Sequence, residues 1–248
     1  MPSMTELNIT PKSEATTATH QPSLAATPES ITDRSSGRSS GRKYGGLSMD
    51  QRRAQRREQF LHAGLEVFGT QGFRASTVRG ICKEAKLTDR YFYESYGSLE
   101  KLLMAVYEDC MLNLIKELLS SMGKTYQVFG AEKAIEVGLT AYFQALEEPR
   151  VARICMVELE GISPEVNKLY NNYIQSISNI LIGLANAAYP DWELSQAEKE
   201  VIGISLVGAL RQSTTNWLMT DYATERSIVV AGTLKLFIGI IDVLSLKK

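Results

Sequence analysis

Apolar residues recur at helical spacing almost without interruption from about Ser48 to the end of the chain. Between about Asp50 and Thr70 they fall at i, i+3, i+4, i+7 and i+8, which is one face of a helix. The residues on this face are Phe60, Ala63, Gly64, Val67 and Phe68. No run alternates apolar and polar residues between turn signals, as a half-buried strand would. The pattern therefore predicts an all-α fold.

Turn residues predict a short second helix. Gly72 is suited to a left-handed stop, after which Phe73 can fold back onto the apolar face of the first helix. Ser76 or Thr77 is then expected as the N-cap of a helix that ends near Ala85.

A third short helix and a long fourth one follow. Thr88 can cap a helix over residues 89–96, and Ser98 can cap one from residue 99 to about residue 122. Two short helices joined by a tight turn are typical of a helix-turn-helix DNA reader, although any three-helix bundle has the same spacing.

Charge is distributed unevenly along the chain, whose formal net charge is −1. Residues 1–33 carry a net charge of −3, residues 34–101 of +7 and residues 102–248 of −5. Because Lys and Arg neutralise phosphates locally, a basic module on an acidic body is typical of a protein in which only the module meets a polyanion.

Residues 1–47 are predicted to form a disordered extension with a basic end, because their few apolar residues are too scattered to offset the entropy of ordering. The basic end runs from Arg34 to Lys43 and repeats Ser-Ser-Gly-Arg, so flexible residues separate its positive charges. It is either a solvated linker or an arm that follows phosphates or enters a minor groove.

The composition argues against an enzyme or a metalloprotein. The chain has three cysteines and two histidines, and Cys82, Cys110 and Cys155 form no Cys-x-x-Cys pair. Two histidines leave little room for a metal site or a Ser-His-Asp relay, so we expect no catalytic residue, no metal and no cofactor. Neither a secretion signal nor a run of about twenty apolar residues is found, so we expect a cytoplasmic protein without a membrane partner.

One stretch carries a specific pattern, FGTQGFRASTVRGICKEAKLTDRYFYESYGSLEKL at residues 68–102. It resembles the N-terminal domain of the TetR family of transcriptional regulators, and the resemblance extends over about residues 52–112. The resemblance implies a three-helix DNA-binding domain followed by a larger helical domain that dimerises and often holds a small-molecule inducer. We place these domains at residues 48–97 and 98–248.

The resemblance also implies which positions meet DNA. At the start of the second helix it implies phosphate contacts from Thr77 and Arg79, and Tyr93 matches the family's usual tyrosine on the phosphate backbone. The positions that it places near base edges are Thr88, Asp89, Arg90 and Tyr91.

Three positions depart from the family's pattern. Lys86 stands where the family usually has Gly, and Gly80 where it often has an acidic capping partner, which implies a different turn and a weaker cap. Leu99 replaces a Lys that touches phosphate in many members, so clamping of the DNA backbone falls to Lys101, Tyr93 or the basic arm.

The third helix has an inward and an outward arc at 100° per residue. Phe92 and Tyr96 fall together on the inward arc, whereas Arg90, Tyr91 and Glu94 face outward. An outward Arg90 can contact guanine O6 and N7, and Tyr91 can touch a thymine methyl or a phosphate. The alternative is that Arg90 and Glu94 form only a surface pair at i, i+4.

Glycines and prolines divide the larger domain into helices. Gly123 is interpreted as the end of the fourth helix, and Pro149 as the end of a helix over about residues 129–147. The helices expected after Pro149 cover residues 150–160, 164 to about 188, 196 to about 220 and 224 to about 246.

The last two helices are apolar most of the way round, so each must be buried on more than one side. One interpretation is a central core pair within the chain. The other, which the resemblance also implies, is a two-fold four-helix dimer interface. The residues assigned to that interface are Leu206, Gly208, Leu210, Leu234, Phe237 and Ile241.

Met and aromatic side chains supply adaptable apolar walls for a ligand. The candidate pocket residues are Met104, Tyr107, Met111, Tyr142, Phe143, Met156, Tyr173 and Trp217, although core packing explains most of them equally well. Arg153, Glu158 and Arg211 flank apolar runs, where they can orient a polar ligand or belong to a solvated face or an ordinary ion pair.

These features together predict a homodimeric, sequence-specific regulator that binds double-stranded DNA at a palindromic operator and is a repressor released by a small-molecule inducer. An activator and a ligand-independent regulator are alternatives of the same class. From a different class, the alternative is a helical ligand carrier or scaffold whose basic module binds a protein or a membrane surface.

Overall fold

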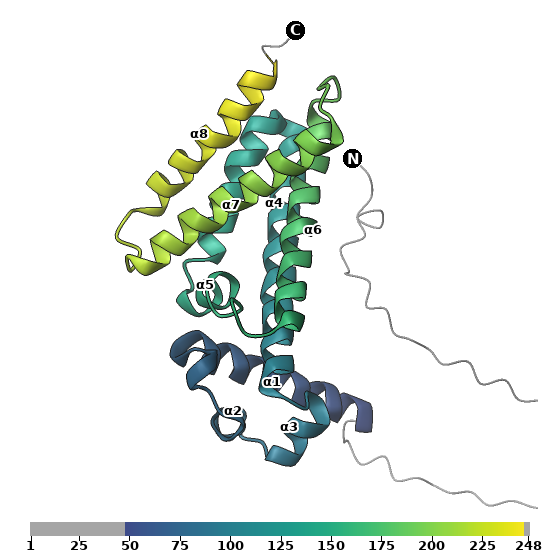
Figure 1. Ribbon diagram of the computed structural model, residues 1–248, viewed down its shortest axis with the longest axis vertical. Helices are drawn as coiled ribbons and strands as arrows, with labels where there is room; N and C mark the ends of the chain where they lie inside the picture. The colour runs from purple at the N-terminus through teal and green to yellow at the C-terminus, as the bar shows by residue number, and fades with distance from the viewer. Residues whose placement is uncertain (1–47, 246–248) are drawn as a thin grey trace, which may run out of the picture.

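The computed structural model describes residues 48–245, a range with eight α-helices, one 3₁₀ turn and no strand (Figure 1). The helices are α1 (Met49–Gln71), α2 (Val78–Ala85), α3 (Asp89–Ser95), α4 (Leu99–Ala145), α5 (Pro149–Met156), α6 (Pro164–Ala188), α7 (Gln196–Met219) and α8 (Arg226–Ser245). The predicted all-α fold is confirmed. The predicted basic arm lies outside the described residues.

Helices α1, α2 and α3 form a module at one end of the molecule (Figure 1). Phe92 of α3 is fully buried and meets Phe60 of α1 edge-on, with ring centroids 5.6 Å apart. Tyr96 is also buried, as predicted. Thr77 caps α2, since its side chain accepts a hydrogen bond from the backbone N–H of Gly80 at 3.1 Å.

Helix α4 is longer than expected, and the predicted break at Gly123 is wrong. Helical bonding continues through Gly123, and the chain leaves helical dihedrals at Gly130, where φ is +81°. A single helical glycine costs only about 1 kcal/mol, which the packing of its neighbours overrides. Beyond Gly130 the second part of α4 packs on the first, and a Cβ at Gly138 would lie 2.7 Å from the Met122 side chain.

Helix α5 is shorter than the predicted range 150–160. Helix α4 ends at Ala145, close to the end predicted before Pro149. Pro149 is itself the first residue of α5, a position that suits the fixed φ of proline. The helix stops early because Glu158 turns towards the module, where its carboxylate accepts the backbone N–H of Phe73 at 2.6 Å.

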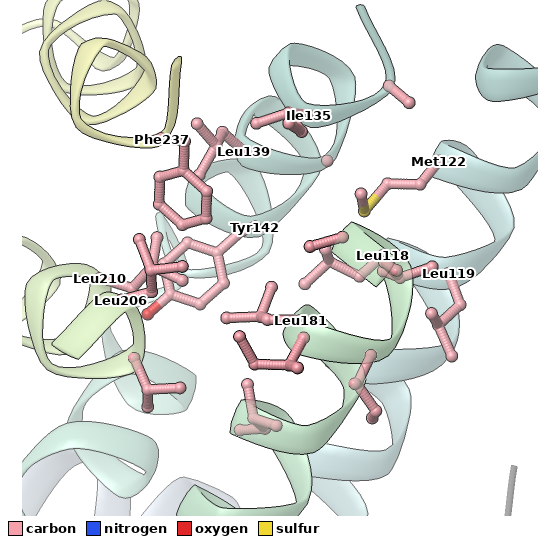
Figure 2. A pocket seen from close by; sticks show the side chains of 18 of the residues that line it. Leu118, Leu119, Met122, Ile135, Leu139, Tyr142, Leu181, Leu206, Leu210 and Phe237 are labelled. Atoms are coloured by element: carbon pink, nitrogen blue, oxygen red, sulfur yellow. The ribbon is translucent and has the colours of Figure 1, made fainter. Parts of the chain in front are cut away.

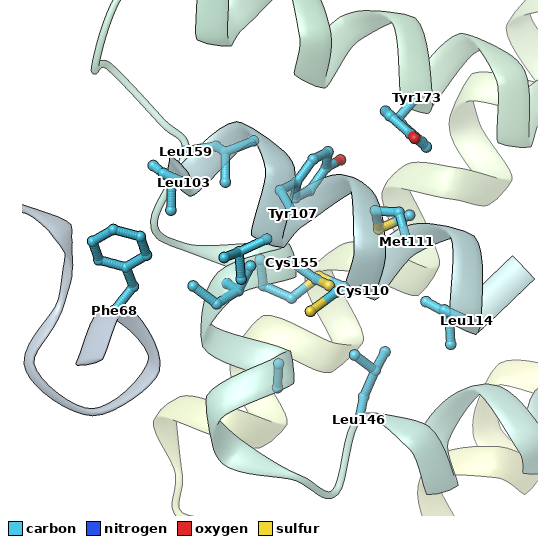
Figure 3. Packing of buried hydrophobic residues seen from close by; sticks show 14 of the residues in the cluster. Phe68, Leu103, Tyr107, Cys110, Met111, Leu114, Leu146, Cys155, Leu159 and Tyr173 are labelled. Atoms are coloured by element: carbon cyan, nitrogen blue, oxygen red, sulfur yellow. The ribbon is translucent and has the colours of Figure 1, made fainter. Parts of the chain in front are cut away.

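Helices α4 and α6 run side by side away from the module, and α7 and α8 pack on them at the far end (Figure 1). One hydrophobic core continues from Phe60 in α1 to Phe237 in α8, across the domain boundary predicted between residues 97 and 98. Figure 3 shows the part of this core where Phe68 of α1 faces Leu103 of α4. The module and the body are therefore packed against each other.

Candidate functional site

The outward face of α3 carries exposed polar side chains. Arg90 and Glu94 form an i, i+4 ion pair, with Nε and Oε1 2.8 Å apart. Tyr93 is 59% exposed, and its ring meets Phe92 edge-on at 5.5 Å. Because an exposed pair of this kind contributes little to stability, Glu94 can release Arg90 to a base edge at low cost.

The N-terminal half of α1 braces α3. The guanidinium of Arg56 lies 4.4 Å from the ring centroid of Tyr91, which is half-buried as a result. Arg57 donates to the carbonyl of Ser95 at 2.5 Å, and the Tyr96 hydroxyl donates to the carbonyl of Arg57 at 3.0 Å. The sequence gives no local signal for these contacts, because they join residues about 35–40 positions apart.

The turn between α2 and α3 is held from inside. Lys86 adopts the left-handed conformation, with φ 55° and ψ 37°, at the position where the resemblance leads one to expect glycine. Thr88 is the N-cap residue of α3, but its side chain makes no capping hydrogen bond. The side chain of Asp89, the first residue of α3, accepts a hydrogen bond from the Cys82 thiol. Burial, assisted by Asp89, raises the pKa of Cys82 to about 11. Asp89 therefore has a structural partner within the turn.

The eight residues predicted to meet DNA lie on α2, α3, their caps and the first turn of α4, at one end of the molecule. All are exposed except Tyr91, and they are Thr77, Arg79, Thr88, Asp89, Arg90, Tyr91, Tyr93 and Lys101. Residues 48–97 carry nine basic and six acidic side chains, so this end is positively charged. The contacts of these residues with DNA stay predictions.

A cavity of about 480 Å³ lies in the body, between α4, α5, α6, α7 and α8 (Figure 2). The break at Gly130 lets the two parts of α4 line it together. Its size is within the range of small-molecule sites. The apolar side chains labelled on its walls are Leu118, Leu119, Met122, Ile135, Leu139, Leu181, Leu206, Leu210 and Phe237.

Few polar groups interrupt these walls. Among the described lining residues there is no carboxylate, and the cationic side chains are Lys124 and Arg211. Tyr142 shares a hydrogen bond with Thr214, with the two oxygens 3.0 Å apart. Burial raises the pKa of Tyr142 and of Tyr107, so both phenols are neutral at physiological pH.

Half of the predicted pocket residues line this cavity, namely Tyr107, Met111, Tyr142 and Met156. The others, which are not among its lining residues, are Met104, Phe143, Tyr173 and Trp217. Tyr173 meets Tyr107 edge-on at 5.4 Å (Figure 3), and Phe143 meets Trp217 at 5.8 Å. Periodicity predicts that a residue is buried, but it does not separate a cavity wall from the core behind it.

Helix α5 is tied to the C-terminal part of α1. Arg150 forms ion pairs with Glu148 and with Glu66 of α1, and these two partners raise its pKa. Gly69 lets the helices approach closely, because a Cβ there would lie 2.5 Å from the Cβ of Arg150.

Arg153 and Glu158 provide a second link. They form an ion pair with Nε and Oε1 2.6 Å apart, and Glu158 also holds the N–H of Phe73 just after α1. Neither Arg153 nor Glu158 lines the cavity. Of the roles considered from the sequence, an ordinary ion pair therefore fits them better than contact with a ligand. The end of α5 thus connects the cavity wall at Met156 to the module of α1, α2 and α3.

Helices α7 and α8 together expose an apolar stripe that nothing in the described chain covers. The large exposed side chains of this stripe are Val201, Ile204 and Met219 on α7, and Ile228, Leu236 and Val243 on α8. Gly208 lies on the exposed side of α7, where a Cβ would meet nothing within 4 Å. By length and composition alone α8 is apolar enough to cross a membrane, although its other side packs on α4.

Some residues assigned to the dimer interface face inward within one chain. Leu210, Phe237 and Ile241 are each 8% exposed and line the cavity, so in one chain they already have apolar neighbours. The sequence does not tell the inner face from the outer in helices that are apolar nearly all round, and the interface itself stays a prediction. Leu206 and Leu234 are half-buried.

A comparison with family models finds that residues 60–106 match bacterial regulatory proteins of the tetR family. The matched segment begins within α1, includes α2 and α3, and ends in the first part of α4.

Two proteins of known function are similar to most of the chain. The fatty acid metabolism regulator protein of Bacillus subtilis (strain 168) is 20% identical over 183 residues, which are 73% of this chain and 93% of that protein. The HTH-type transcriptional activator FasR of Mycolicibacterium smegmatis is 22% identical over 184 residues, which are 74% of this chain and 81% of FasR.

Solved structures share the fold. The fatty acid degradation regulator FadR from Bacillus halodurans has a TM-score of 0.65 and 20% identity, covering 74% of this chain and 95% of its own. FadR from Bacillus subtilis, solved in complex with stearoyl-CoA, has a TM-score of 0.62 and 20% identity, covering 72% and 96%.

Proposed function

Since the chain is a transcriptional regulator of the tetR family of bacterial regulatory proteins, we propose that α3 reads an operator in the major groove and that an apolar ligand in the body controls this binding. The observation that carries the proposal is the apolar cavity of about 480 Å³, whose wall at Met156 belongs to the helix tied to α1. The chain then acts by binding, without catalysis.

The proposed DNA contacts follow from the exposed face of the module. Arg90 and Tyr91 are directed to base edges, and Thr77, Arg79 and Tyr93 to phosphates, with Lys101 beside them. Such a surface gives binding that weakens steeply with salt, because each neutralised phosphate releases counterions.

The proposed operator is palindromic because the protein is proposed to act as a homodimer. The exposed stripe on α7 and α8, rather than the inward residues Leu210, Phe237 and Ile241, is the surface that a second copy covers. An isologous contact of two such helix pairs makes a four-helix interface and relates the two α3 helices by a two-fold axis. A membrane is the alternative partner of this stripe, and flotation with liposomes separates the two.

The proposed ligand contains a long acyl chain. The cavity walls are hydrocarbon over most of their area, and one structural neighbour was solved with stearoyl-CoA. We favour a repressor that the ligand releases from DNA. An activator that needs its ligand uses the same cavity, as the similarity to the activator FasR illustrates. The cavity favours both of these over a ligand-independent regulator.

Selection of bound sites from a random duplex library tests the DNA part. We expect a palindromic product bound with an affinity that falls about a thousandfold or more between 50 and 200 mM salt, if six or more phosphates are contacted. Adding palmitoyl-CoA or palmitate to the complex then tests the ligand part through the change in operator affinity. If no sequence is enriched, the proposal of sequence-specific operator binding is overturned. If neither lipid changes the operator affinity, the proposal of ligand control is overturned.

A further inference from the structure

One charged group in the cavity wall has no counter-charge. Arg211 of α7 lines the cavity, and its Nε is the one buried side-chain nitrogen or oxygen atom in residues 48–245 without a hydrogen-bond partner. Its Nη2 donates to the carbonyl of Met156 at 2.7 Å, and its guanidinium lies 4.8 Å from the ring centroid of Tyr170. None of the ion pairs in the described chain includes Arg211.

Arg211 is half-buried, with its Nε atom shielded from solvent, so water compensates its charge only in part and an opposite charge with hydrogen bonds would stabilise it further. The described lining residues contribute no carboxylate that could do so. The free Nε can donate one further hydrogen bond, and an anion placed there receives it as a charge-assisted bond.

We propose that Arg211 binds the carboxylate of a free long-chain carboxylic acid, whose hydrocarbon chain lies along the apolar walls of the cavity. This inference rests on the proposed function, in which an acyl ligand controls DNA binding. It specifies the free acid because a thioester carbonyl is neutral and leaves the charge of Arg211 uncompensated. A coenzyme A thioester would place its phosphates on the exposed Lys124 instead.

The same contact gives the ligand a route to the module. Arg211 holds the carbonyl of Met156, the last residue of α5, and Glu158 two residues later holds the N–H of Phe73 beside the end of α1. A carboxylate that draws the guanidinium towards itself would weaken or reorient the hydrogen bond between Arg211 and the Met156 carbonyl. If the ligand binds more tightly to one placement of α5 against α1 than to another, it shifts the protein towards that placement.

The test compares head groups of equal chain length by titration calorimetry on the full chain, with dodecanoate, dodecanol and dodecanoyl-CoA as probes. We expect dodecanoate to bind about tenfold or more tightly than dodecanol, because the carboxylate gains a charge-assisted bond. Arg211→Gln should remove this advantage and leave dodecanol binding unchanged. Arg211→Lys, which keeps the charge, should retain part of it, and circular dichroism of both variants reports whether they fold.

The outcomes separate the inference from the function on which it rests. Equal losses for acid and alcohol in Arg211→Gln, or no loss for either, would overturn the role of Arg211 as the carboxylate partner. Tighter binding of dodecanoyl-CoA that is lost in Lys124→Gln and kept in Arg211→Gln would also overturn it, while the proposed acyl control stands. No binding of any of the three probes, and none of palmitate or palmitoyl-CoA, would overturn acyl control itself.

Discussion

At the scale of single residues, Arg90 shows how a side chain can be paired in the free protein and still be available to DNA. Its partner Glu94 sits one turn along α3, and both are exposed. The free protein therefore has the Arg90–Glu94 surface pair, which the sequence analysis gave as the alternative to a base contact. This pair does not prevent a base contact, because an exposed ion pair contributes little and the base can replace Glu94 as the acceptor.

Replacing Arg90 with Ala should lower affinity for the best operator about tenfold to a hundredfold and relax the preference at one position in each half-site. The reason is the loss of a bidentate contact to guanine. Binding assays on the selected site and on random duplex measure the two effects. An equal loss on random DNA would assign Arg90 to a phosphate. Glu94→Gln is the matched control, which frees Arg90 and should not weaken binding.

The raised pKa of Cys82 predicts slow alkylation in the folded protein. Thiolate is the reactive form, and a pKa of about 11 leaves less of it at pH 8 than an unperturbed thiol with a pKa of about 8.5 has. Because the folded pKa is raised, stability from this group is complete below the unfolded pKa and declines as pH rises towards 11. Peptide mass spectrometry after iodoacetamide treatment at pH 8 and 10 measures the rate at Cys82, with the urea-unfolded chain as reference. A folded chain that reacts as fast as the unfolded one at pH 8 contradicts the shift.

At the scale of elements, α5 is the contact between cavity and DNA-reading module, and its approach to α1 depends on Gly69. A Cβ at Gly69 would lie 2.5 Å from the Cβ and 2.8 Å from the Cα of Arg150. The second atom belongs to the backbone, so a side-chain rotation does not relieve the contact, and α5 must move.

Gly69→Ala should therefore destabilise the protein by about 1–3 kcal/mol, the usual cost of overpacking. Gly183→Ala is the matched control, since α6 offers its Cβ open space and the change should stabilise by about 0.5–1 kcal/mol. Urea unfolding followed by circular dichroism measures both. If Gly69→Ala were as stable as Gly183→Ala, the close approach of α1 and α5 would not constrain this pair.

The elements also show what a sequence can and cannot predict. The N-caps Thr77 and Ser98 were among those expected from the sequence, because a cap is read from residues three or four positions apart. The break at Gly130 was placed at Gly123 instead, because the choice between two glycines depends on packing between distant segments. The links from Arg150 to Glu66 joined residues 84 positions apart and had no local signal.

At the scale of the whole molecule, the same distinction decides the interface. Periodicity identified α7 and α8 as helices buried on two sides, but it assigned the cavity residues Leu210 and Phe237 to the dimer. Only packing against α4 and α6 shows which side faces outward. The sequence predicted a cavity lined by Met and aromatic side chains, whereas Leu and Ile outnumber Met and aromatic residues among its lining residues.

Gly208→Arg tests the proposed dimer. In one chain the new side chain has open space, so the variant should fold, whereas an arginine inside an apolar contact between copies brings an unpaired charge. We expect folded monomers by light scattering and circular dichroism, with loss of specific binding to a palindromic site. Gly183→Arg is the control and should stay dimeric. A dimeric Gly208→Arg would mean that the interface lies on another surface.

The break in α4 predicts a site of protease cleavage. Val128 and Phe129 are each 70% exposed next to Gly130, and chymotrypsin cleaves after such aromatic residues when the backbone can adapt to its cleft. The flanking residues Gln127 and Ala131 line the cavity, so a bound ligand restrains the same backbone that the protease must engage. The rate of cleavage after Phe129 should therefore fall when a ligand occupies the cavity. Limited proteolysis can then compare candidate ligands without labelling the protein.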